Sequence, residues 1–370
     1  MLIIQSLPLT WIRLLLRLIQ TSRSWRDKPI KLPLFFERYR SAIDAELKAV
    51  LSQLQLPLYD MMRYHLGWIN EHGHHLPSAS GKALRPTLCL LACEASGGTY
   101  TTALPGAVAI ELVHNSSLIH DDIQDEDKER RHRPTVWSIW GKPQAINTGM
   151  AMRTLANLAI RRLGIQDVAI QKQILAQSIL DEASLRLNEG QFLDLSYENH
   201  IDAGVMDYLD MIEKKTAALI QCSVQMGALL GTDDETVIAR FRTFGNNLGL
   251  AFQIRDDVLG IWGNDRKTGK PVGMDIQRRK KSLPIVFALE KAPEEMRKEL
   301  LNIYRKETVT AIDEGTVLEV LEAVNAHLYA QEMAWEFHDR AIAEIKELGL
   351  SPSAEHELQE VAHFVAQRDF

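Results

Sequence analysis

Apolar residues recur at three- and four-residue spacing along most of the chain from about residue 34 onward, which is typical of amphipathic helices. The pattern predicts helices over residues 36–54, 56–70, 83–95, 103–122, 144–163, 168–195, 205–230 and 234–261. No alternating apolar run with an Asn-Gly or Asp-Gly turn indicates a β-hairpin. Because several of these helices are long and lack heptad regularity, we expect an all-α fold, a single large helical bundle with its site in the middle.

Two loops interrupt the helical pattern, over residues 71–80 and 263–282. The second loop contains glycines and is strongly basic, and it follows a helix that ends in carboxylates. A basic loop in that place suits a lid over phosphate groups. The alternative is an ordinary solvated loop.

The first 25 residues are rich in Leu and Ile and contain no acidic residue. Arg13 and Arg17 interrupt the apolar run, so it is too short to span a membrane. It also lacks the charge order and cleavage site of a signal peptide. An interfacial helix and an extension without function both remain open. We therefore divide the chain into an N-terminal extension, 1–33, and one domain, 34–370.

Composition narrows the function further. The 370 residues are 46% hydrophobic, enough for one large core, and the formal net charge is −7. This charge argues against a nucleic-acid partner, so local groups of Lys and Arg must hold any anionic substrate. The three cysteines, Cys89, Cys93 and Cys222, are too few for a metal site and read as buried thiols of a cytoplasmic protein.

Two aspartate clusters end predicted helices. Asp121 and Asp125 are four residues apart with Asp122 between them, so the outer two share a helix face. Asp256 and Asp257 end the predicted helix 234–261. Clustered carboxylates repel each other unless cations neutralise them, and magnesium prefers oxygen ligands that it can share with phosphates. A solvated helix end would explain either cluster alone, but the two together favour a metal site.

Basic pairs accompany these clusters, and Lys and Arg are the residues that bind phosphate oxygens. They are Lys82 with Arg85, Arg130 with Arg131, Lys214 with Lys215, and Lys270 with Lys281. Any one pair suits a surface salt bridge. Together with two acidic clusters they indicate diphosphate substrates, held partly by metal and partly by the side chains themselves.

At this point the sequence resembles a known family. The order Gly-Lys-x-x-Arg-Pro, His-x5-His-Asp-Asp-x-x-Asp, Arg-Arg-x-Arg-Pro-Thr, Lys-Thr and Phe-Gln-x-x-Asp-Asp is similar to that of the trans-polyprenyl (isoprenyl) diphosphate synthases, geranylgeranyl diphosphate synthases among them. The resemblance covers about residue 34 to the C-terminus. It implies a bundle around a central cavity, a homodimer and about three magnesium ions.

The resemblance also implies residue roles. Asp121, Asp125 and Asp256 correspond to metal ligands, and with Asp122 and Lys215 they form the catalytic set. The allylic diphosphate would be held by Arg130, Lys215, Thr216, Gln253 and Lys270, with Lys281 a weaker member. The isopentenyl diphosphate would be held by Lys82, Arg85, His114 and Arg131, with Gly81 a weaker member. Magnesium and these cations would stabilise the leaving diphosphate, and isopentenyl diphosphate would attack the allylic cation.

Three positions depart from the family pattern. Gly260 replaces the last aspartate of the second acidic motif, which leaves that motif one carboxylate short. Ala83 stands where an arginine is usual, and Met150 where an aspartate is usual. We expect Met150 to be the strongest sign of altered activity.

Product length is suggested by the residues one turn before Asp121. Ser117 and Ser116 lie four and five residues before it, where large aromatic side chains would block a growing chain, and Val113 lies further back. Two serines leave room, so we expect a product of about 20 carbons or longer. The alternative is that both serines face elsewhere.

Two other functions fit the same scaffold. A terpene cyclase would ionise a single prenyl diphosphate and would need no second basic pocket. A non-catalytic partner subunit of a heteromeric synthase would not need Asp121, Asp122 and Asp125. The residues listed for isopentenyl diphosphate favour the chain-elongating enzyme.

Overall fold

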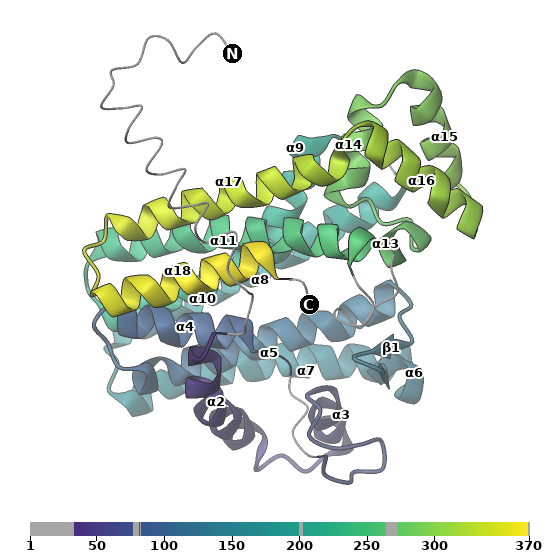
Figure 1. The fold of residues 1–370 in the computed structure, drawn as a ribbon. Helices are drawn as coiled ribbons and strands as arrows, with labels where there is room; N and C mark the ends of the chain where they lie inside the picture. The colour runs from purple at the N-terminus through teal and green to yellow at the C-terminus, as the bar shows by residue number, and fades with distance from the viewer. Residues whose placement is uncertain (1–32, 77–80, 82, 200–202, 264–272, 369–370) are drawn as a thin grey trace, which may run out of the picture.

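The computed structural model describes residues 33–76, 81, 83–199, 203–263 and 273–368, and within them almost all regular structure is helical (Figure 1). The expectation of an all-α fold is confirmed. The α-helices are α2 (Phe35–Leu51), α3 (Pro57–His65), α4 (Leu84–Ala95), α5 (Tyr100–Gln124), α6 (Val136–Trp140), α7 (Lys142–Ile160), α8 (Ile170–Asn199), α9 (Val205–Ile212), α10 (Ala218–Gly231), α11 (Glu235–Trp262), α13 (Met274–Gln277), α14 (Leu283–Lys291), α15 (Glu294–Tyr304), α16 (Ala311–Ala323), α17 (Ala326–Lys346) and α18 (Pro352–Gln367).

The long helices run side by side, and the ends of α5 and α11 lie in the same region of the bundle. Helix α5 packs between α4 and α7, while α10 packs between α4 and α11. Helix α17 lies along α11 and closes the bundle on the side away from α5 (Figure 1). Apolar faces meet along these contacts, and aromatic side chains such as Phe241 and Phe244 are fully buried there. The bundle therefore fixes the ends of α5 and α11 relative to each other.

The helix predicted over 205–230 is interrupted in the structure. A π-helical turn, Glu213–Ala217, separates α9 from α10 and contains both Lys215 and Thr216. Such turns are rare, and many occur at functional sites. Helix α8 approaches this turn closely through Gly190, where an added Cβ would lie 2.6 Å from Cα of Lys215. The missing side chain at Gly190 is what lets the two backbones meet.

The expectation of no β-hairpin was wrong for one short segment. Glu129–Arg130 and Arg133–Pro134 form a two-stranded antiparallel pair between α5 and α6. Arg131 and His132 make its turn with positive φ values of 53° and 59°. Positive φ at both central residues is the type I′ geometry that Asn-Gly normally provides. Because Arg and His rarely adopt it, the sequence carried no turn signal, and tertiary contacts impose the conformation.

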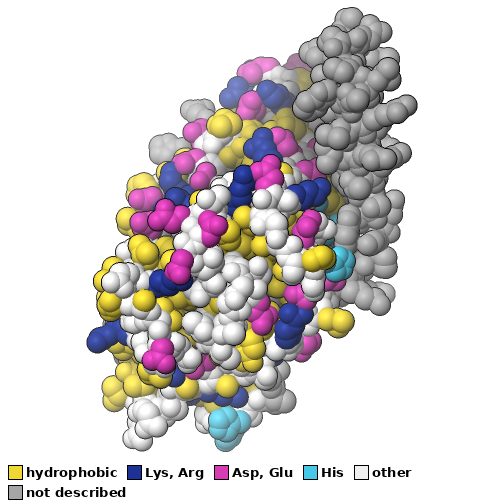
Figure 2. Space-filling model, turned by 90° about the vertical axis from the view of Figure 1, so that its left-hand side faces the viewer, with side chains coloured by type: hydrophobic (Ala, Val, Ile, Leu, Met, Phe, Trp, Pro, Cys, Tyr) yellow, Lys and Arg dark blue, Asp and Glu magenta, His cyan; other side chains and the backbone are white. Residues whose placement is uncertain are grey.

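The surface and the thiols agree with the composition. On the face in Figure 2, Lys and Arg side chains lie among Asp and Glu side chains, so neither sign dominates it. Cys89, Cys93 and Cys222 are buried free thiols, as expected. Among the helices that the structure describes, none is long and apolar enough to cross a membrane. The predicted N-terminal extension, residues 1–33, lies outside the described part of the chain except for its last residue.

Substituting Gly190 tests the contact between α8 and the π-turn. In Gly190→Ala the new methyl group would collide with the Lys215 backbone, and overpacking of this kind costs about 1–3 kcal/mol. We expect a lower melting temperature in calorimetry. Gly315→Ala is the matched control, because nothing lies within 4 Å of its added Cβ in helix α16, and it should stabilise the protein by up to about 1 kcal/mol. Equal melting temperatures for the two variants would contradict the close contact.

Candidate active site

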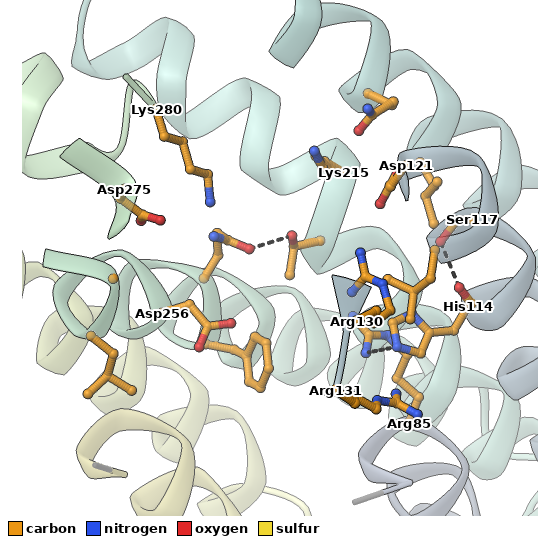
Figure 3. Close-up of a pocket in the computed structure, with 18 residues that line it drawn as sticks. Arg85, His114, Ser117, Asp121, Arg130, Arg131, Lys215, Asp256, Asp275 and Lys280 are labelled. Carbon is orange, nitrogen blue, oxygen red and sulfur yellow. Dashed lines mark hydrogen bonds between the residues drawn. The ribbon is translucent and has the colours of Figure 1, made fainter. Parts of the chain in front are cut away.

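One pocket, of about 430 Å³, lies between the ends of α5 and α11 and brings most of the predicted site residues together (Figure 3). Charged and polar side chains from seven parts of the chain line it: α4, α5, the hairpin, α8, the π-turn, α11, and α13 with the segment after it. They are Arg85, His114, Ser117, Asp121, Arg130, Arg131, Gln191, Lys215, Thr216, Gln253, Asp256, Asp275 and Lys280. Apolar residues, among them Leu118, Leu187 and Phe252, complete the lining. The pocket can therefore hold a molecule with a highly charged end and a hydrocarbon part.

The first acidic wall is the end of α5. Asp121 lines the pocket, and burial raises its pKa and that of Asp125 above the usual value even though the Lys215 ammonium lowers both. Lys215 itself forms an ion pair with Asp194 of α8. Asp194 was not anticipated, since nothing in the periodicity of α8 distinguishes it. Several carboxylates thus share one nearby lysine, and ionising them all is costly without another cation.

Asp122 lies beside this wall with its side chain turned out of the main pocket. It is 1% exposed, and its Oδ1 accepts a hydrogen bond from Arg130 Nε at 2.7 Å. Burial raises the pKa of Asp122 to about 6, although Arg130 lowers it. Its Oδ2 is buried without a hydrogen-bond partner among the described residues. Asp122 therefore holds Arg130 beside the pocket.

The second acidic wall separates two adjacent aspartates. Asp256 lines the pocket with its side chain 41% exposed, and it pairs with Arg368, whose guanidinium stacks over the Phe252 ring at 3.8 Å. Asp257 instead points into the protein and is 1% exposed. It accepts hydrogen bonds from the Tyr208 hydroxyl and, at 3.0 Å and 2.8 Å, from Gln253 Nε2 and the Leu283 N–H. Burial raises its pKa to about 6.

Basic and polar groups lie between the two acidic walls. Lys215 and Lys280 point into the pocket from opposite sides (Figure 3). The Thr216 hydroxyl donates a 2.7 Å hydrogen bond to Gln253 Oε1, which ties the π-turn to α11. Lys281 follows Lys280 and was predicted to bind the allylic diphosphate. It instead donates a hydrogen bond to the Tyr197 carbonyl and does not line the pocket. Lys82 and Lys270 lie outside the described residues.

A second basic cluster closes one end of the pocket. Nη1 of Arg85 lies 3.4 Å from Nε2 of His114, and Arg131 lines the same end. Gly81 packs against the Arg131 guanidinium, so closely that an added Cβ would lie 3.0 Å from Nη2. Burial, together with Arg85 and Arg131, lowers the pKa of His114 well below its ordinary value. His114 is therefore neutral, and the positive charge of this end comes from the arginines.

The predicted chain-length residues separate in the structure. Ser117 lines the pocket, and its hydroxyl donates to the His114 carbonyl at 2.8 Å. Ser116 is 4% exposed and faces α7, where it donates to the Gly149 carbonyl at 2.9 Å. Val113 is buried and does not line this pocket.

The three departures also lie in different places. Met150 is exposed on α7, away from the pocket, whereas Gly260 lines it. Ala83 precedes α4 with a φ of 50°, a left-handed conformation that is uncommon for alanine.

The donor set suits a hard divalent cation. Asp121, Asp125 and Asp256 offer only carboxylate oxygens, and burial already disfavours the ionised form of the first two. Within the described residues no three acidic, His or Cys side chains come close enough to enclose a metal by themselves. Magnesium is usually held by one or two carboxylates, with substrate phosphates and water completing its shell. The two walls therefore fit metal ions that are shared with a phosphorylated substrate.

The chain is similar in sequence and in structure to known proteins. The sequence profile of the family described as polyprenyl synthetase matches residues 67–322. A (2E,6E)-farnesyl diphosphate synthase of Mycobacterium tuberculosis is 36% identical over 88% of this chain and 90% of its own length. A geranylgeranyl diphosphate synthase of the same species is 39% identical over 85% and 89%. The crystal structure of a polyprenyl synthetase from Streptomyces coelicolor superposes with a TM-score of 0.84 at 35% identity, covering 90% of this chain and 98% of that one.

Neutralising the two adjacent aspartates should separate their roles. In Asp257→Asn the side-chain N–H₂ would face either the Gln253 donor or the Leu283 and Tyr208 donors, and a buried mismatch of this kind costs about 1–3 kcal/mol. Asp256→Asn alters a partly exposed group and should leave the free energy of unfolding nearly unchanged. Urea titrations of both variants measure the difference. A stability loss for Asp256→Asn as large as that for Asp257→Asn would contradict these assignments.

Proposed function

The chain belongs to the polyprenyl synthetase family, and we propose that it condenses an allylic diphosphate with isopentenyl diphosphate, with magnesium, to give a longer trans-prenyl diphosphate. The observation that carries this proposal is the arrangement of charge in one pocket. Asp121 and Asp256 line it from α5 and α11, and Lys215 and Lys280 point into the space between them. A separate basic end formed by Arg85 and Arg131 provides for a second diphosphate.

The charges account for ionisation of the allylic substrate. Asp121, Asp125 and Asp256 would hold magnesium, which when bound neutralises diphosphate oxygens and makes that group a better leaving group. Lys215 and Lys280 face the same oxygens and stabilise charge as it develops. The allylic C–O bond breaks and its electron pair leaves with the diphosphate. Leu118, Leu187 and Phe252 keep water from the resulting cation.

The second basic cluster supports elongation. Arg85 and Arg131 would hold isopentenyl diphosphate so that its double bond attacks the allylic cation. A new C–C bond forms, and a proton then leaves the adjacent carbon, with the departed diphosphate as its acceptor. The neutral His114 side chain hydrogen-bonds with Arg85 and adds no charge to this cluster. A terpene cyclase would not need this cluster and is our second candidate, favoured only by the missing carboxylate at Gly260.

The product we propose contains about 20 carbons or more, because Ser117, a small residue, lines the pocket one helical turn before Asp121. The two mycobacterial relatives carry the names of enzymes that make different chain lengths, farnesyl and geranylgeranyl. Ser117 faces the pocket one helical turn before Asp121, whereas Ser116 faces α7.

We also propose that the enzyme acts in the cytoplasm as a homodimer, with residues 34–370 as its catalytic domain. Helices α7 and α8 carry large apolar side chains that are more than 40% exposed. They are Ile146, Met150, Leu158, Ile170, Ile174, Leu175, Leu185 and Phe192. Residues 174, 185 and 192 share one face of α8 by helical spacing. An apolar face of this kind suits a second copy of the chain.

The proposed reaction can be tested with purified protein, magnesium and defined substrates. Dimethylallyl, geranyl and farnesyl diphosphate are each incubated with and without isopentenyl diphosphate, and the products are identified by mass spectrometry. Longer diphosphates that form only with isopentenyl diphosphate and magnesium support the proposal. A hydrocarbon formed without isopentenyl diphosphate would instead identify a cyclase.

Enlarging Ser117 should shorten the product. In Ser117→Phe an aromatic ring would occupy part of the pocket one helical turn before Asp121, so we expect the product distribution to shift by at least one five-carbon unit toward shorter chains. Chromatography of dephosphorylated products measures this. Ser117→Ala is the control and should keep the original distribution, since it only removes the hydroxyl. Unchanged chain length in Ser117→Phe would refute the assignment.

A charge placed on the exposed face of α8 should separate the proposed dimer. Leu185 is 61% exposed, and Leu185→Glu would force a carboxylate into a buried apolar contact. Light scattering after gel filtration should then give half the wild-type mass. Ile312→Glu, at an 82% exposed position on α16, should leave the mass unchanged. A wild-type protein of monomer mass would refute the dimer directly.

A further inference from the structure

Gly260 leaves an unusual space beside the second acidic wall. It follows Asp256 by four residues on α11, so both positions face the pocket. Another side chain already fills the room that a residue at 260 would need. A Cβ built on Gly260 would lie 2.5 Å from Cγ and 3.0 Å from Oδ1 of Asp275. The carboxyl group of Asp275 therefore sits where a side chain of residue 260 would begin.

The chain holds Asp275 in this place through a folded-back segment. Gly273 adopts a φ of 72°, and its N–H donates to the carbonyl of Ile261 at 3.3 Å. Ile276, the residue after Asp275, is fully buried in the same apolar cluster as Ile261. The Lys280 N–H donates to the Asp275 carbonyl at 2.8 Å. These contacts fix the short helix α13 against the end of α11, with Asp275 turned toward the pocket (Figure 3).

Asp275 also stands next to the lysine that enters the pocket from this side. Nζ of Lys280 lies 4.0 Å from Oδ1 of Asp257. Partial burial lowers the pKa of Lys280, but Asp275 and then Asp257 raise it by more, so the lysine stays charged. A carboxylate here thus balances Lys280 and adds negative charge beside Asp256.

We propose that Asp275 supplies the carboxylate that residue 260 lacks, so that Asp256 and Asp275 together form the acidic wall that supports a divalent cation bound with the allylic diphosphate. The same function is then divided between two elements, α11 and α13. Gly260 and Asp275 form a coupled pair: a side chain at 260 would require the carboxyl group of Asp275 to move from its present place. This inference rests on the proposed function, because it assigns a further residue to the same site.

Binding of an unreactive allylic diphosphate, such as a thiolodiphosphate analogue, tests the inference without turnover. Calorimetric titrations at several magnesium concentrations give the magnesium dependence of analogue affinity. We expect Asp275→Asn to need at least about 10-fold more magnesium for the same affinity. Glu314→Gln is the control, because Glu314 accepts a hydrogen bond from Gln277 of α13 but does not line the pocket. It should bind like the wild type.

Moving the carboxylate back to α11 completes the test. Gly260→Asp alone should lower the melting temperature, because its side chain collides with Asp275. The double variant with Gly260→Asp and Asp275→Ala should recover both the melting temperature and the wild-type magnesium dependence to within about 3-fold. A wild-type magnesium dependence in Asp275→Asn would overturn the inference. If the wild type itself binds no analogue with magnesium, the proposed function fails instead, so the two failures are distinguishable.

Discussion

Like charges gathered at the ends of α5 and α11 are the constraint on which this site depends. Asp121, Asp125 and Asp194 lie close enough to Lys215 to share its charge, and burial raises the pKa of the first two. Carboxylates in such a place are stable only with compensating cations or donors. The neighbouring arrangements follow from this need. Arg130 pairs with Asp122, Arg368 with Asp256, and three donors surround Asp257.

The helical scaffold meets this constraint through local irregularities. The π-turn over Glu213–Ala217 places Lys215 and Thr216 between α8 and α11, and Gly190 lets α8 approach it. The strained turn at Arg131 and His132 projects a hairpin from the end of α5. Each irregularity costs local conformational energy, and each lies beside the pocket. Strain of this kind persists where surrounding packing enforces it and where the position of a side chain matters.

Adjacent residues with the same chemistry receive different roles here. Asp256 faces the pocket while Asp257 is enclosed by Tyr208 and the start of α14. Lys280 enters the pocket while Lys281 bonds to the Tyr197 carbonyl. Ser117 faces the pocket while Ser116 bonds to α7. Consecutive helix positions point about 100° apart, and Lys280 and Lys281 lie in the segment between α13 and α14. In each pair, the packing of neighbouring elements decides which residue is available to a ligand.

The sequence by itself determined the helical class, the approximate limits of the main helices and the identity of the acidic and basic motifs. These follow from local periodicity and from residue chemistry at short spacing. It did not reveal the β-hairpin, the π-turn, Asp194, Asp275 or Lys280, nor the direction of Ser116 and Lys281. Each of these depends on contacts between segments far apart in the chain. Only tertiary packing fixes such contacts, so no local pattern could encode them.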